Sequence, residues 1–99
     1  MIYEIAEIDI KPGEETLFEA AVKEAAAQFK KSKGCCSLEL HKGIERPATY
    51  RLIVGWETVE DHTVTFRNSE EFREWRRLAS AHFALPPRVE HVTVVLEAF

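Results

Sequence analysis

The fold is decided by the stretch Trp56-Glu-Thr-Val-Glu-Asp-His-Thr-Val-Thr-Phe-Arg-Asn-Ser-Glu-Glu-Phe-Arg-Glu-Trp75. Thr58 stands three residues before Asp61, the spacing of a capping box at a helix start. His62 and Phe66 follow on one helical face. This half of the stretch therefore predicts a short helix with one inward face.

A second helix is predicted directly after Asn68, because Ser69 is a favourable N-cap and two glutamates follow it in the first turn. One face of this helix carries Phe72, Trp75, Arg76, Ala79, His82 and Phe83. Pro86-Pro87 is expected to end it.

Outward from this stretch, strands and one further helix follow from changes in hydrophobic period. Alternation predicts strands over 2–10 and 36–41, a β-branched and aromatic run predicts one over 49–57, and alternation predicts the last over 89–98. A 3.6-residue period predicts a helix over 14–33, closed by Gly34. The order strand, helix, strand, strand, helix, strand predicts an α+β, ferredoxin-like βαββαβ fold, with two helices on one face of a four-stranded antiparallel sheet.

The sheet face away from the helices is predicted to be apolar. Tyr3, Ile5, Ile53 and Val95 would all lie on it, whereas sheet faces left to water are normally polar. We therefore expect a homodimer in which two sheets pack face to face, burying ~800 Å² or more per copy.

Composition limits the possible classes of function. Ninety-nine residues, 45% of them hydrophobic, fit a single domain spanning 1–99. A net charge of −4 without a basic cluster argues against nucleic acid as a partner. No leader-like segment and no spanning apolar run is present, so we expect no membrane partner and a cytoplasmic location.

Metal and cofactor motifs are missing from the sequence. The histidines are scattered, and neither HExxH nor a glycine-rich phosphate loop occurs. The adjacent Cys35 and Cys36 would point to opposite faces of a strand, which suits small apolar fillers better than a redox pair. We expect no metal site and no cofactor, so that an enzyme built on this chain would work cofactor-free.

The pattern as a whole resembles the antibiotic biosynthesis monooxygenase (ABM) domain family along essentially the entire chain. The residues that carry the resemblance are Trp56-Glu57, Asp61-His62-Thr63-Val64, Phe66-Arg67, Ser69, Phe72, Trp75-Arg76, Pro86-Pro87 and Val89-Glu90-His91. The resemblance implies a dimeric α+β barrel and cofactor-free oxygenation of aromatic or quinol-like compounds. One branch of the family degrades haem and carries an Asn on its first strand. This chain has only Glu4, Glu7 and Asp9 as polar residues there, which disfavours that activity.

Cofactor-free oxygenation needs a base, an anchor for an anionic substrate and a dry pocket. We expect His62 to be the catalytic base, titrating near neutral pH, or else a histidine that is only hydrogen-bonded in place. Arg76 and Arg67 are expected either to bind a substrate oxyanion or to pair with one of the seventeen acids.

Three further residues are candidates for substrate binding. Trp75 and Trp56 would stack on an aromatic ring or belong to the core, and His91 would add a polar contact or lie at an interface. Whether the chain is an enzyme stays open at this point. The first hypothesis is a cofactor-independent monooxygenase acting on an electron-rich aromatic or quinol-type molecule. The alternative is a non-catalytic dimeric module that binds a small hydrophobic or aromatic molecule.

Overall fold

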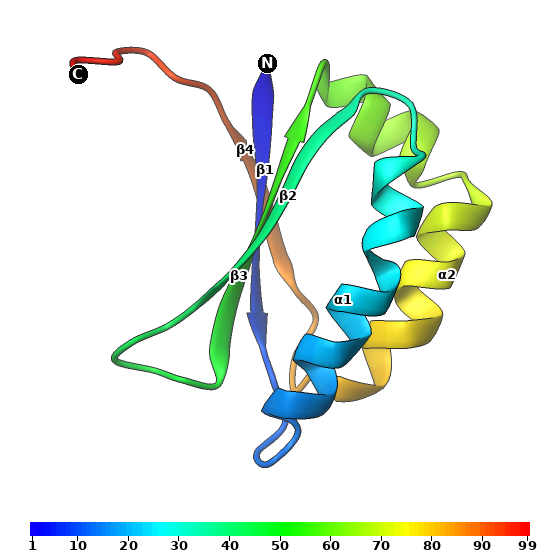
Figure 1. Cartoon of the computed structure of the whole chain (residues 1–99), viewed down its shortest axis with the longest axis vertical. Coiled ribbons are helices and arrows are strands. Elements are labelled where there is room, and N and C mark those ends of the chain that lie inside the picture. Colours follow the sequence, from blue (N-terminus) through cyan, green and yellow to red (C-terminus); the bar gives the residue numbers. More distant parts are fainter.

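A computed structural model describes residues 1–99, and its secondary structure follows the predicted order. The elements are β1 (Ile2–Asp9), α1 (Glu15–Lys30), β2 (Cys35–Lys42), β3 (Thr49–Trp56), the π-helix η1 (Asp61–Phe66), α2 (Glu70–Ala79), the short 3₁₀-helix η2 (Ser80–His82) and β4 (Arg88–Val92). All helices lie on one side of the sheet (Figure 1). Neither α-helix is long and apolar enough to cross a membrane.

The sheet is antiparallel throughout, with strand order β2-β3-β1-β4. This order confirms the ferredoxin-like α+β prediction, since the first and third strands are central neighbours. In the register Ile5 lies opposite Ile53 of β3 and opposite Glu90 of β4. Strands β1 and β3 are therefore hydrogen-bonded on both edges and form the centre of the sheet.

The core lies between the sheet and the helices. On β1 every second residue is buried, so that Glu4, Ala6 and Ile8 all face the helices. The helix α1 contributes the buried stripe Phe18, Ala21, Val22, Ala25 and Phe29, as its 3.6-residue period predicts. A glutamate is thus buried at the end of an apolar row.

The capping residues act as predicted at both helices of the opening stretch. The hydroxyl of Thr58 accepts a hydrogen bond from the Asp61 amide at 3.1 Å, and that of Ser69 accepts one from the Phe72 amide at 3.2 Å. The second helix, however, ends at Ala79, before the proline pair predicted to end it. Phe83 instead forms an isolated bridge with Ile10 of the first strand, which draws the chain out of the helix.

The last strand is shorter than predicted. It ends at Val92, because Val92 already pairs with Tyr3, and only Met1 and Ile2 of the neighbouring strand remain beyond that point. Residues 93–99, here called the C-terminal arm, leave the sheet and extend away from it (Figure 1). Val95, expected on the sheet, lies on this arm and is 94% exposed.

The sheet face away from the helices has an apolar centre and a charged end. Tyr3, Ile5 and Ile53 lie on it as predicted. Toward one end of the face, Glu7 forms an ion pair with Arg88 at 2.7 Å, and Arg51 stands 3.9 Å away. No element of this chain covers the apolar centre.

Candidate functional site

A cavity of about 310 Å³ lies between the sheet and α2. Its walls are mainly apolar and include Ala6, Ile8, Leu52, Phe72, Trp75 and Val89. Four polar side chains also line it, namely Glu4, His62, Arg67 and Arg76. The cavity thus combines an aromatic wall with few polar groups, as small-molecule sites do.

The polar groups at one end of the cavity form a connected line. His62 Nε2 lies 3.2 Å from Glu4 Oε1, and His62 Nδ1 lies 2.8 Å from His91 Nε2. The indole N–H of Trp56 donates to the same Glu4 oxygen at 3.0 Å. The side chains of Glu4 and His62 are 7% and 3% exposed, so the line runs through the protein interior to the half-buried His91.

The position of His62 follows from the π-helix and its neighbours. Its ring stacks on Trp56 with 5.5 Å between centroids, and Phe66 packs on the same indole at 5.3 Å. Because Trp56 is completely buried at the end of β3, this stack fixes the imidazole against the sheet. Nδ1 is then hydrogen-bonded to His91 and Nε2 lies against Glu4, which limits rotation of the ring.

Burial sets the protonation states in the line. It raises the pKa of Glu4 from 4.5 to about 7, although the Trp56 hydrogen bond and the charge of Arg67 both lower it. Burial, together with the charge of Arg67, lowers the pKa of His62 from 6.5 to about 4. The expectation that His62 titrates near neutral pH was therefore wrong, whereas the pKa of Glu4 lies there.

Arg67 and Arg76 have no acidic partner. Every other arginine of the chain lies beside a carboxylate, namely Arg46, Arg51, Arg73, Arg77 and Arg88. The two arginines of the cavity are exposed at its mouth and form no ion pair. Of the two fates considered for these residues, pairing with an acid of the chain does not occur.

The structure brings four of the predicted site residues to the cavity wall, namely His62, Arg67, Arg76 and Trp75. Trp56 and His91 lie behind the wall, where both hold the Glu4–His62 pair. Glu4 was missed as a site residue, since a glutamate near a chain start is typical of a surface strand. The available signal was its parity with Ala6 and Ile8, which placed it on the inward face.

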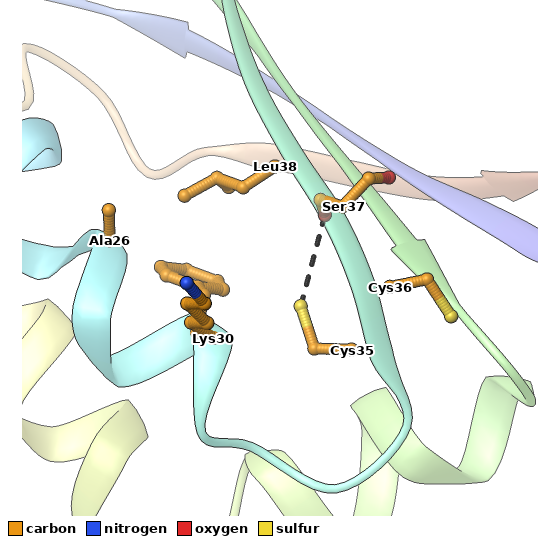
Figure 2. A pocket seen from close by; sticks show the side chains of 7 residues that line it. Ala26, Lys30, Cys35, Cys36, Ser37 and Leu38 are labelled. Carbon is orange, nitrogen blue, oxygen red and sulfur yellow. Dashed lines mark hydrogen bonds between the residues drawn. The ribbon is translucent and has the colours of Figure 1, made fainter.

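A second hollow, of about 290 Å³, lies between α1 and β2 beside the cysteine pair. Figure 2 shows Cys35 and Cys36 on opposite sides of the strand, as expected. Both thiols are free, and burial raises the pKa of Cys35, which weakens it as a nucleophile. No group of three or more His, Cys, Asp or Glu residues is placed to hold a metal ion.

Comparisons with known proteins show the family of the chain. The chain belongs to the antibiotic biosynthesis monooxygenase family, whose sequence pattern matches residues 1–78. It is 42% identical over 91 residues to the uncharacterized protein YczJ of Bacillus subtilis, covering 92% of this chain and 96% of that one.

Solved structures extend the likeness to the whole fold. A crystal structure from Bordetella bronchiseptica that bears the same family's name is 48% identical, with a TM-score of 0.95, and the match covers 96% of this chain and 97% of that one. A family structure from Nitrosomonas europaea, at 15% identity and a TM-score of 0.82 over 95% of this chain and 89% of that one, shares the fold.

Proposed function

We propose that the chain is a cofactor-independent monooxygenase acting on an electron-rich aromatic or quinol-type small molecule. The observation that carries this proposal is the buried Glu4–His62–His91 line at one end of an apolar cavity. Such a substrate reacts with dioxygen once it has lost a proton, so the protein must supply a proton acceptor and keep water away.

Each cavity residue has a proposed role. His62 is neutral at pH 7 and acts with Glu4 as the base that takes the substrate's hydroxyl proton. Arg67 stabilises the resulting anion and Arg76 anchors the ligand from the other end of the cavity, because neither guanidinium forms an ion pair with a carboxylate of the chain. Trp75 provides an aromatic wall, while Trp56 and His91 hold the base in position.

We further propose that the functional unit is a homodimer formed through the open face of the sheet. The uncovered centre at Tyr3, Ile5 and Ile53 supports this proposal, because such faces are normally buried. The exposed C-terminal arm offers more apolar surface to a second copy. A cytoplasmic location stays a prediction.

One observation favours a non-catalytic binding module as the second candidate. Both ring nitrogens of His62 are already engaged, at 3.2 Å with Glu4 and at 2.8 Å with His91. A base in this position must exchange a hydrogen bond before it takes a proton. A module that only binds an aromatic metabolite has no such requirement.

Oxygen uptake by metal-free protein with a hydroquinone or an anthrone-type substrate tests the first candidate. We expect His62→Ala to lower the rate about 10²-fold or more, the usual contribution of a general base. His62→Gln keeps a hydrogen-bonding group beside Glu4 and should also be slow, which separates loss of the base from loss of the fold. His41→Ala, on the exposed surface of β2, is the matched control and should leave the rate unchanged.

An unchanged rate in His62→Ala would exclude His62 as the base. Binding of the same compounds without any oxygen uptake by the wild type would support the binding module instead.

A further inference from the structure

The two ends of the cavity have opposite polarity. Glu4 and Ile8 both line it and lie four residues apart on β1, a span of roughly 13 Å at about 3.3 Å per residue. The helix α2 begins beside Phe66 and runs to Ala79, after which Phe83 reaches Ile10. Arg76, late in this helix, therefore stands at the Ile8 end, and Glu4 stands at the other.

Glu4 has one oxygen to spare. Its Oε1 accepts a hydrogen bond from the Trp56 indole and contacts His62, whereas its Oε2 has no partner within the protein. Every fully buried side-chain oxygen or nitrogen of the chain has a hydrogen-bond partner, so this Oε2 is not fully buried. Since the residue is 6% exposed and lines the cavity, the spare oxygen opens into that space.

A carboxyl group in this position matches a ligand hydroxyl. As a carboxylate it accepts a hydrogen bond from the hydroxyl, and as an acid it donates one to the hydroxyl oxygen. A ligand carboxylate at this end would meet the Glu4 carboxyl as well as Arg67, whereas at the Arg76 end it meets an unpaired guanidinium, and Glu4 is the only acid that lines the cavity. The chain thus favours one orientation of a ligand that carries both groups.

The volume accommodates a ring system between these two groups. A cavity of about 150 Å³ holds a single benzene ring, and this one measures about 310 Å³. Two fused rings therefore fit this space. The faces of Phe72 and Trp75 supply the aromatic contact.

We propose that the cavity takes a one- or two-ring hydroxyaryl carboxylate, with its carboxylate on Arg76 and its hydroxyl on Glu4. This inference names the substrate class of the oxygenation proposed above and rests on that site. It places the reacting hydroxyl beside His62 and beside the charge of Arg67, where an anion would form.

Equilibrium binding under anaerobic conditions tests the proposal separately from turnover. We expect 6-hydroxy-2-naphthoate to bind the full-length protein about tenfold or more tightly than 2-naphthoate, which lacks the hydroxyl, and than 2-naphthol, which lacks the carboxylate.

Variants assign each end of the ligand. Arg76→Gln should weaken the hydroxynaphthoate about ten- to hundredfold and leave 2-naphthol unchanged. Glu4→Gln keeps the fold-supporting contacts. The wild type should bind 6-hydroxy-2-naphthoate more tightly than 2-naphthoate, and this variant should abolish or reverse that preference. Arg73→Gln, on the same helix but paired with Glu70 outside the cavity, should change nothing.

Equal affinity for the three naphthalene probes, or an Arg76→Gln protein that binds like the Arg73→Gln control, would overturn the inference. Tight and selective binding without oxygen uptake in air would uphold the inference while removing the proposed oxygenation.

Discussion

Glu4 makes the stability of the fold depend on pH in the acid-to-neutral range. Its pKa in the folded chain, about 7, lies above the unfolded value of 4.5, so the native state binds more protons between these two pH values. Stability must therefore fall as the pH rises through this window. His62 acts in the opposite direction. Its pKa is lowered from 6.5 to about 4, so the stability of the fold decreases as the pH falls through this window.

Replacing the carboxyl with an amide should remove the first of these effects. We expect Glu4→Gln to gain stability relative to the wild type as the pH rises from 4.5 to 7, on the order of 3 kcal/mol across the window at about 1.4 kcal/mol per pKa unit. Urea unfolding at several pH values measures this. Glu57→Gln, an exposed acid on the loop after β3, should follow the wild-type curve. Parallel curves for Glu4→Gln and the wild type would show that Glu4 is not held protonated.

At the scale of single residues, the sequence predicted where the side chains lie better than it predicted their contacts and pKa values. Helical spacing correctly placed His62 on an inward face, and strand parity was enough to place Glu4 there too. Their contact could not be predicted, because it joins residues fifty-eight positions apart through the packing of η1 on the sheet. The lowered pKa of His62 depends on that burial and could not be predicted from spacing alone.

At the scale of elements, the turn between α1 and β2 controls where η1 begins. Gly34 has φ of +79°, and a Cβ built there would lie 2.1 Å from Asp61 Oδ2 and 2.9 Å from Asp61 Cβ. Asp61 is itself buried at the first position of η1. The absence of a side chain at Gly34 thus lets the π-helix seat against the turn.

Gly13 and Gly34 together separate two effects of adding a side chain, the strain of a left-handed backbone and the overlap with a neighbouring residue. Gly13 has a similar φ of +85° but open space around it. Gly13→Ala should cost only the left-handed backbone penalty, about 1–2 kcal/mol, whereas Gly34→Ala should cost about 2–5 kcal/mol, because overpacking adds to that penalty. Chemical denaturation of the two variants measures the difference. Equal losses would mean that Asp61 moves aside freely.

Element identity followed from local sequence, but the ends of α2 and β4 did not. The alternation of Val92, Val94 and Leu96 is as regular beyond the strand as within it, so the pattern alone could not predict the end of β4. The strand stops where its pairing with β1 stops, at Val92 opposite Tyr3. Strand ends set by a partner's length are invisible to a periodicity argument.

For the whole molecule, the open sheet face is the feature that a second copy would cover. Ile5 lies at its centre, opposite Ile53. We expect Ile5→Lys to convert a dimer into a monomer, because it places an unpaired charge in an apolar interface. Sedimentation velocity at micromolar concentration measures this. Ile44→Lys, in the exposed β2–β3 turn, should remain dimeric. A wild-type protein that sediments as a monomer would refute the dimer.

The C-terminal arm offers a way to measure how much of the protein has dimerised. Its backbone leaves the sheet after Val92, and Phe99 at its tip is fully accessible. An extended, unpaired segment of this kind is a preferred site of proteolytic cleavage. We expect limited proteolysis to cleave this arm quickly in isolated copies and slowly in copies whose arms are covered by a partner. Mass spectrometry over time would then count the unassembled fraction without a label.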